Sequence, residues 1–421
     1  MMWDMISICL FEDSEVNQLA PITTTRPVYD TVLGTSTLFE KIYRYYDFAN
    51  ISLHCRDYLK NQTKKTYPDI VVNNINMGTP CLFINGRLYL TETVFNELSQ
   101  IDEKHNMLFT YQGDLVAAYI RGELLEMIRA ALHTLPSSKD LIQIIRQKAI
   151  CKELDHAHMI GHTWDFLKLN EDAINADFSF RNQRAIVKAN VKPFTAIYNE
   201  NNVYIESGTV IEDFVVINAE NGPIYIDKNV HIEAHTRLEG PLYIGPNSHI
   251  LGGKIKSSTI GSNCKIAGEV SASIIYPYSN KAHEGFLGNS LIGSWVNLGA
   301  MTTTSNLKNN YKPVKVELDK TTIETEQTFL GSIIGDYVKT SIGTTLNTGT
   351  VIAVGSTLYD TGFHNKYIKP FTWGSPNNYT LHRKEAFINT LETMMQRRNK
   401  QLDTNTKELI DYLYQRFSNH D

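Results

Sequence analysis

The chain has 421 residues, which is long enough for two or three domains. Hydrophobic residues make up 42% and charged residues 20%, so the composition excludes wholesale disorder. Lys and Arg total 40 against 45 Asp and Glu, a formal net charge of −5. The overall charge therefore favours neither nucleic acid nor an anionic membrane as a partner.

The apolar stretch near the N-terminus, Ile6–Phe11, has no basic region before it and is followed by Glu12 and Asp13. We expect it to form a first β-strand and not a signal peptide. No stretch reaches the roughly 18 uninterrupted apolar residues of a membrane-spanning helix. The five cysteines include no C-x-x-C pair, which favours reduced thiols over disulfides or a zinc site. These features predict a cytoplasmic protein.

Short apolar runs alternate with helical periodicity over the first part of the chain. This alternation predicts a mostly parallel α/β sheet in a domain covering residues 1–190. The expected strands are Ile6–Phe11, Ile51–Cys55, Ile70–Val72 and Cys81–Ile84, and the expected helices are 36–48, 92–101, 122–134 and 140–154. We interpret Gly113 and Asp114, which lie between apolar runs, as a hairpin turn.

From residue 203 an aliphatic residue recurs every six positions, as at Ile205, Ile211 and Ile217, and glycine often follows it. This period indicates a parallel β-helix over residues 203–370, in which each short strand turns one aliphatic side chain inward. An antiparallel sandwich is the alternative, but its strands alternate with period two. About eight coils of roughly 18 residues would form the stack. The period is lost over residues 301–333, which predicts an excursion loop.

The pattern becomes helical again after the β-helix. Leu381–Arg398 and Thr406–Phe417 have apolar residues at helical spacing. They predict a helical extension over residues 371–421 that caps the stack or contacts a neighbouring subunit.

The segment Ser279–Ala300 resembles the acetyltransferase signature of the bifunctional bacterial enzymes that make UDP-N-acetylglucosamine, here called the GlmU-like family. Further stretches along the whole chain resemble a divergent branch of that family. The resemblance implies a left-handed hexapeptide-repeat β-helix behind a nucleotidyltransferase-like α/β domain. It also implies a homotrimer with the acyl-donor site between subunits. The stretches that carry the wider resemblance are Leu19–Pro27, Glu40–Lys41, Phe83–Arg87, Trp164–Asp165 and Asn218–Pro223.

The resemblance implies acyl transfer from acetyl-coenzyme A to an amino sugar in the second domain. His283 would be the base, since imidazole exchanges protons near neutral pH. Its alternative is a surface histidine at a corner of a coil. The other implied residues are Asn297, Asn306, Lys312 and Phe286 at the substrate and Ala300 at the acyl donor.

Two residues depart from the family pattern around this site. Ser271 stands where the family has a phosphate-binding lysine, and Phe286 stands where it has a tyrosine. An upstream arginine that contacts phosphate in the family has no counterpart. A site with fewer cations holds a sugar phosphate less well, so either the substrate differs or acetyl transfer is lost.

The first domain departs further from sugar nucleotidyltransferases, because Glu12–Pro27 replaces their glycine-rich phosphate loop. Arg26 and Lys41 could supply positive charge to a nucleoside triphosphate and a sugar phosphate. Asn85, Gly86 and Arg87 stand where the family has the carboxylate that usually holds Mg²⁺, so that metal ligand is missing.

One helix of the first domain carries a further candidate. Trp164 and Asp165 resemble a stretch of the sugar-phosphate nucleotidyltransferases. A packed tryptophan followed by an aspartate at the start of a helix explains the same residues equally well.

Three functions follow from these patterns. The leading one is a two-domain transferase of sugar-nucleotide biosynthesis that uses nucleoside triphosphate, sugar phosphate and acetyl-coenzyme A. The second is a protein in which only the β-helix is active. The third is a non-catalytic sugar-nucleotide sensor or scaffold that has lost both activities.

Overall fold

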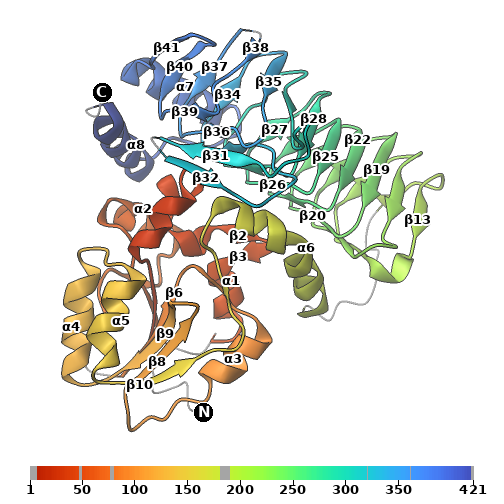
Figure 1. The fold of residues 1–421 in the computed structure, drawn as a ribbon. Helices are drawn as coiled ribbons and strands as arrows, with labels where there is room; N and C mark the ends of the chain where they lie inside the picture. The colour runs from red at the N-terminus through yellow and green to blue at the C-terminus, as the bar shows by residue number, and fades with distance from the viewer. Residues whose placement is uncertain are drawn as a thin grey trace. The chain divides into compact units, whose positions relative to one another are not determined.

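A computed structural model describes residues 7–46, 50–75, 80–180, 190–319, 321–360 and 362–418. The chain divides into two compact units, coloured along the chain in Figure 1. The first unit holds residues 1–31, 36–162 and 403–412, and the second holds 32–35, 163–402 and 413–421. The division after His162 lies well before the boundary near 190 that we expected. Ile6 and residues 181–189 lie outside the described residues.

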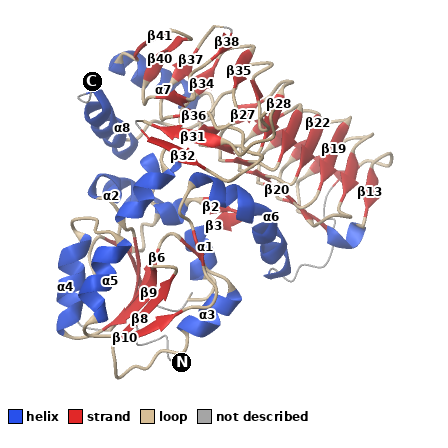
Figure 2. Cartoon of the chain, in the orientation of Figure 1, coloured by secondary structure: helices blue, strands red, loops and turns tan. Residues whose placement is uncertain are grey.

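The first unit is built on one mixed sheet of seven strands (Figure 2). The apolar run near the N-terminus forms the central strand β1 (Ser7–Phe11), as predicted, and β1 pairs in parallel with β4 and β6. β6 is buried throughout, and β4 is buried except at Asn50. β8 and β9 form an antiparallel hairpin whose turn holds Gln112 and Gly113, which confirms the expected hairpin. The other strands, in sheet order, are β10 (Ile150–Glu153), β8 (Met107–Tyr111), β9 (Asp114–Ile120), β6 (Cys81–Asn85), β4 (Asn50–Leu53) and β5 (Val71–Val72).

Helices α4 and α5 cover one apolar side of this sheet with leucine and isoleucine side chains. α5 begins at a capping box formed by Ser137 and Asp140, which satisfies backbone donors at the start of the helix. We expected a helix over 140–154, but α5 ends at Arg146 and β10 follows, because Ile150–Glu153 pairs with Met107–Thr110 at the sheet edge. The helices of this unit are α1 (Leu38–Tyr43), α2 (Lys60–Thr66), α3 (Glu92–Leu98), α4 (Glu123–Leu132) and α5 (Ser138–Arg146). Two short strands, β7 (Leu88–Tyr89) and β11 (His158–Met159), form an antiparallel pair, and β3 (Ser36–Thr37) precedes α1.

The second unit is a parallel β-helix with three faces, which we number 1, 2 and 3 in the order that each coil passes them. Face 1 consists of β14 (Val203–Ile205), β17 (Ile224–Ile226), β20 (Leu242–Ile244), β23 (Thr259–Ile260), β26 (Ile274–Ile275), β29 (Leu291–Ile292), β33 (Ile333–Ile334), β36 (Val351–Ile352) and β39 (Tyr367–Ile368). Face 2 consists of β12 (Asn190–Val191), β15 (Val210–Ile211), β18 (His231–Ile232), β21 (His249–Ile250), β24 (Lys265–Ile266) and β27 (Asn280–Lys281), then a bridge through Asn297, β34 (Lys339–Thr340), β37 (Thr357–Leu358), β40 (Thr372–Ser375) and β41 (Asn378–Leu381). Face 3 consists of β13 (Ala196–Tyr198), β16 (Val216–Asn218), β19 (Thr236–Glu239), β22 (Gly253–Lys256), β25 (Glu269–Ser271) and β28 (Phe286–Gly288), with β30 (Thr303–Thr304), β35 (Thr344–Leu346) and β38 (Gly362–Phe363) forming a further sheet.

Each coil turns one side chain of every face into a single core. Ile232, Ile250 and Ile266 are partners in adjacent strands of face 2, and all three are fully buried. Because each level stacks on the level before it, the aliphatic repeat builds one continuous core along the unit. The outer side of face 1 is also covered in part, where Tyr204, Tyr225 and Tyr243 pack with Phe178 of α6 (Thr163–Phe180). β2 (Val32–Leu33) also belongs to this unit.

The corner between faces 1 and 2 has a left-handed backbone at successive levels. Asn229, Asn247 and Asn263 adopt φ between +57° and +59°, and asparagine tolerates this conformation better than most residues. The next two levels place Tyr278 (φ +66°) and Trp295 (φ +61°) at the same corner. A bulky aromatic residue at positive φ costs conformational energy, so these two levels differ from those before them.

The predicted excursion contains a hairpin of β31 (Lys315–Leu318) and β32 (Thr321–Glu324). The C-terminal extension contains two helices, as expected: α7 (Lys384–Gln396) and α8 (Thr404–Ser418). α7 packs through Phe387, whose ring meets Phe371 of the β-helix edge to face at 5.3 Å. None of the helices in the described part of the chain is both long enough and apolar enough to cross a membrane.

Candidate functional site

His283 lies at the corner between faces 2 and 3, after β27 and before β28. Its side chain is exposed, and no described residue forms a hydrogen bond or an ion pair with the imidazole. An imidazole in this position can accept a proton from a group that docks against the corner.

Lys281 holds the backbone at this corner from inside the β-helix. It occupies the inward position that Ile266 occupies in the strand before it, and it is only 3% exposed. Its Nζ donates to the carbonyl of Ala267 at 2.8 Å and to the carbonyl of His283 at 2.9 Å. Burial lowers the pKa of Lys281 to about 8. The buried ammonium of Lys281 therefore fixes the backbone of His283, the candidate base.

The following coil stacks directly against this corner. The backbone N–H of Met301 donates to the carbonyl of Glu284 at 2.9 Å, which places Ala300 one level beyond His283. Gly285 adopts φ +128°, and any Cβ there would collide with the carbonyl oxygen of Thr302. The close stacking brings the predicted base and the predicted acyl-donor residue, Ala300, to the same corner.

Phe286 and Asn306 meet on face 3 beside this corner. A Cβ at Gly288 would lie against the Phe286 ring and 2.8 Å from Nδ2 of Asn306. Asn306 Nδ2 donates to Oδ1 of Asn289 at 2.8 Å, which fixes the amide. Ser271, which stands where the family has a phosphate-binding lysine, pairs with Gly288 in the adjacent strand and therefore lies on the same surface.

The two remaining predicted residues of the β-helix lie elsewhere. Asn297 is on face 2, where its Oδ1 accepts a hydrogen bond from Asn280 Nδ2 at 3.3 Å. It lines a groove between face 2 and α7. Lys312 is exposed in the excursion loop, and no contact among the described residues joins it to His283.

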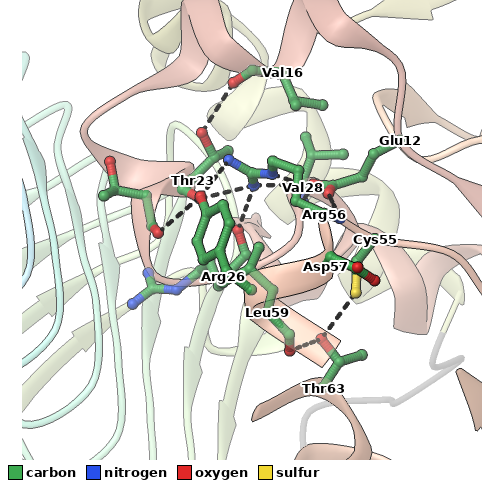
Figure 3. A network of polar contacts seen from close by, with 12 residues as sticks. Glu12, Val16, Thr23, Arg26, Val28, Cys55, Arg56, Asp57, Leu59 and Thr63 are labelled. Carbon is green, nitrogen blue, oxygen red and sulfur yellow. Dashed lines mark hydrogen bonds and ion pairs between the residues drawn. The ribbon is translucent and has the colours of Figure 1, made fainter. Parts of the chain in front are cut away.

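The first unit replaces a glycine-rich loop with a chain of short 3-10 turns, η2 (Ser14–Leu19), η3 (Ile22–Thr24) and η4 (Val28–Asp30). Glu12 and Arg56 hold these turns together (Figure 3). The Arg56 guanidinium binds the Glu12 carboxylate at 3.0 Å and donates through Nη2 to the carbonyls of Thr23 and Arg26. Glu12 also accepts the backbone N–H of Val28 at 2.8 Å. The Glu12 carboxylate thus occupies a backbone N–H group of this loop. In a phosphate-binding loop, such backbone N–H groups are left for the ligand.

A second buried network surrounds Asn85 and Arg87. Arg87 is 1% exposed, and its guanidinium contacts Asp13 and Asp114 at 2.8 and 2.9 Å. Asn85 Nδ2 donates to the same Asp13 at 2.6 Å. Burial alone would lower the pKa of Arg87, but the carboxylates of Asp13 and Asp114 raise it above its usual range. Arg87 therefore neutralises the buried carboxylate of Asp13 and the half-buried carboxylate of Asp114. Gly86 permits the close approach of Tyr29 and Val28.

The other predicted nucleotide-binding residues are also largely enclosed. Lys41 is 1% exposed, with Nζ 3.3 Å from Ser36 Oγ and 5.7 Å from the centre of the Tyr89 ring. Arg26 is half-buried. Asp165 belongs to the second unit, where it forms an ion pair with Lys168 at 3.5 Å. No group of three or more potential metal ligands occurs among the described residues.

Sequence reasoning missed Asp13, Arg56 and Lys281 as organising residues. Asp13 and Arg56 carry no local pattern, because their partners lie far away along the chain. Lys281 did carry a signal, since a lysine occupies a position where the six-residue period calls for an aliphatic residue. A charged residue at an inward position of a β-helix predicts a specific internal partner.

Comparison with known proteins matches residues 8–185 to a family described as sugar nucleotidyl transferase. The bifunctional protein GlmU of Methanococcus vannielii is 30% identical over 198 residues, which is 47% of this chain and 41% of that protein. The bifunctional sugar-1-phosphate nucleotidylyltransferase/acetyltransferase of Sulfurisphaera tokodaii is 29% identical over 202 residues, 48% of this chain and 44% of that protein. The chain thus spans about two fifths of the length of the curated relatives it matches.

Among solved structures, LpxA from Acinetobacter baumannii is 14% identical and aligns over 55% of this chain and 81% of its own, with a TM-score of 0.25. The assignment of the second unit as a β-helix depends on its strand registers and its core, and not on this similarity.

Proposed function

We propose that this chain, which is similar to the bifunctional GlmU proteins over about half of its length, is a transferase of sugar-nucleotide biosynthesis. In this proposal the β-helix transfers an acetyl group from acetyl-coenzyme A to an amino sugar. The first 190 residues act as a sugar-1-phosphate nucleotidyltransferase, residues 203–370 as the acyltransferase, and residues 371–421 as its helical extension. The observation that carries the acyltransferase part is the exposed imidazole of His283 on a corner that Lys281 holds rigid.

The proposed reaction forms one bond and breaks one bond. The amine nitrogen of the sugar attacks the thioester carbonyl carbon, so an N–C bond forms and the C–S bond breaks. His283 takes the proton from the nitrogen and returns it to the leaving thiolate. Ala300, one level away, would contact the acyl donor through its backbone, and Asn306 and Phe286 would border the sugar. Asn297, which the resemblance implies at the substrate, lies instead in the groove on face 2. Lys312 would reach the substrate only from the excursion loop.

The state of assembly in this proposal is a homotrimer in the cytoplasm, with a second copy covering the His283 corner. Met301 and Ile342 support it, because both are at this corner and are 58% and 73% exposed. Large apolar side chains exposed beside a candidate base indicate a surface that a partner or the acyl chain covers. Light scattering after gel filtration tests the assembly, since Ile342→Glu should release monomers.

Acetyl transfer is tested with purified protein, acetyl-coenzyme A and a panel of amino-sugar phosphates. His283→Ala should lower the turnover number about 100-fold or more, the usual effect of removing a general base. His235→Asn is the matched control, because His235 is an exposed histidine at the same corner and asparagine tolerates its φ of +63°. Full activity in His283→Ala would refute the assignment.

The nucleotidyl-transfer part draws on the family match and on Arg26, Lys41, Asn85, Gly86, Arg87 and Asp165. In this part the half-buried Arg26 would face the nucleotide. Lys41 is buried, so its charge would act from inside the unit. Asn85 and Arg87 would act by holding Asp13. Asp13 is a carboxylate beside Asn85, which stands at the family's metal-ligand position, but the ion pair of Asp13 with Arg87 already neutralises it. The residues present therefore do not fit a metal site at this position. Pyrophosphate release from UTP, dTTP, GTP or CTP with a sugar 1-phosphate tests this part.

One observation favours the non-catalytic alternative. The turns that replace the phosphate loop are closed by Glu12, whose carboxylate takes the Val28 N–H and the Arg56 guanidinium. In a sensor, nucleotide sugars would raise the melting temperature without any turnover. Turnover of either kind rules out the sensor.

A further inference from the structure

A groove of about 690 Å³ lies between face 2 of the β-helix and helix α7. Its floor is formed by side chains that point outward from consecutive levels of face 2, namely Lys265, Asn280, Asn297 and Lys339. Asn297 and Lys339 are neighbours here although the whole excursion loop separates them in the sequence. The C-terminal part of α7, with Arg397 and Arg398 after it, forms the opposite wall.

The groove is strongly cationic in a chain whose formal charge is −5. Four of its lining residues are Lys or Arg, and none of those described there is acidic. Arg398 is held in place, because its Nη2 donates to Asn280 Oδ1 at 2.7 Å. Such a concentration of positive charge attracts an anion and fixes it in one place.

Lys339 is the clearest example of a positive charge in the groove that no acidic group compensates. Its side chain is half-buried, and none of the described residues offers its ammonium a hydrogen bond or a carboxylate. Burial lowers the pKa of Lys339 to about 8, and no negative charge offsets the effect. The charge of Lys339 in turn helps to lower the pKa of His382, which is lowered mainly by burial. Even a half-buried cation without an internal partner is costly to maintain unless a ligand supplies the missing anion.

One end of the groove presents two stacked aromatic rings. Tyr278 and Trp295 lie 4.3 Å apart between ring centres with an interplanar angle of 6°. Both occupy the left-handed corner where the three preceding levels carry asparagine. The strained corner is thus used to place two aromatic rings beside four cations and two amides. Flat rings next to cations match a base joined to phosphates.

We propose that this groove binds the nucleoside diphosphate part of a ligand, with its phosphates on Lys339, Lys265 and Arg397 and its base against Trp295. Asn297 offers an amide N–H group that no described residue uses, which suits a ribose hydroxyl or a base edge. The site is distinct from the His283 corner, and the proposal does not depend on acetyl transfer. Two sources share this chemistry, a nucleotide sugar and the nucleotide end of coenzyme A.

Isothermal titration calorimetry with the full-length protein tests the groove. The probes are UDP, UDP-N-acetylglucosamine, coenzyme A, 3′,5′-ADP and inorganic pyrophosphate. Lys339→Met and Arg397→Ala should each weaken the best nucleotide about tenfold. Trp295→Asn should weaken it similarly, and it installs the residue that Asn263 provides at the same corner. Lys254→Met on face 3, whose lysine pairs with Glu239, is the control and should bind as wild type does.

The outcomes separate the two sources and the two proposals. Binding of coenzyme A and 3′,5′-ADP alone identifies the acyl donor, and binding of UDP compounds alone identifies a nucleotide sugar. If pyrophosphate binds as tightly as every nucleotide, the proposed contact with the base is wrong. The proposal is also wrong if neither Lys339→Met nor Trp295→Asn changes the affinity for the nucleotide. No binding at millimolar concentration would overturn the site. His283→Ala should bind normally, so the loss of acetyl transfer in that variant leaves this inference intact.

Discussion

The two units use basic residues in opposite ways. In the first unit Arg56 and Arg87 are buried against Glu12 and Asp13, so each guanidinium has a carboxylate inside the protein. In the groove of the second unit, Lys339 is half-buried among other cations and has no acidic partner in the described structure. Positive charge alone therefore does not mark a ligand site. What marks it is positive charge that the fold leaves unbalanced.

The largest effect expected from this comparison is that of Arg87→Met in the first unit. Removing the guanidinium leaves Asp13 buried and unpaired, which should cost about 3–5 kcal/mol in the free energy of unfolding. Urea denaturation measures it, with Arg121→Met at an exposed position as the control. The double variant Arg87→Met/Asp13→Asn should recover much of the loss. A single variant as stable as wild type would show that the pair is not what holds this network.

The equivalent change in the groove should have the opposite sign. Lys339→Met removes an unbalanced cation from beside Lys265, Arg397 and Arg398, so we expect a gain of about 1 kcal/mol in unfolding free energy at pH 7. The same denaturation experiment measures it, with Lys254→Met as the control. A clear loss of stability would mean that Lys339 has a stabilising role, and the contrast between the two units would fail.

The pH dependence sharpens the same contrast. Because the folded-state pKa of Lys339 is lowered to about 8, the unfolded chain binds more protons than the folded one between about pH 8 and the ordinary lysine value near 10.4. Wild-type stability should therefore rise relative to Lys339→Met across this window. Lys281 contributes a slope of the same sign, but it is present in both proteins and cancels. Melting temperatures from pH 7 to 10 measure the difference, and parallel curves would contradict the shift.

The smallest effect is expected on face 3, where the cations are paired but half-exposed. Arg237 and Lys254 both contact Glu239. Surface ion pairs contribute little because water screens them, so Arg237→Met should change the unfolding free energy by less than about 1 kcal/mol. Loss of several kcal/mol in a thermal or urea melt would show that half-exposed pairs matter as much here as the buried Arg87 pair.

Much of the fold could be predicted from local patterns. The aliphatic repeat at Ile232, Ile250 and Ile266 becomes the inward row of face 2, and the apolar run before Glu12 becomes the central strand of the first sheet. Residues 150–153 were assigned wrongly to a helix, because pairing at a sheet edge decided their conformation. Around His283, the motif predicts the candidate base and Ala300 in adjacent coils, and one coil of stacking is enough to bring the two residues to one corner.

The polar clusters around Arg87 and Lys339 could not be predicted, because their members are far apart in the sequence. Asn85, Gly86 and Arg87 were singled out by a motif position, yet only the fold shows that Asp13 and Asp114 occupy the Arg87 guanidinium. No pattern in the sequence joins Lys339 to Asn297, since the excursion loop lies between them.

The β-helix, the sheet strands and the corner that holds His283 follow from local sequence patterns, because each depends on side chains close together in the chain. Which cations are neutralised and which have no acidic partner among the described residues follows only from the folded structure. The physical reason is that the energy of a charge depends on all its neighbours in space and on its exclusion from water. Those neighbours come from strands, coils and helices that the sequence keeps far apart.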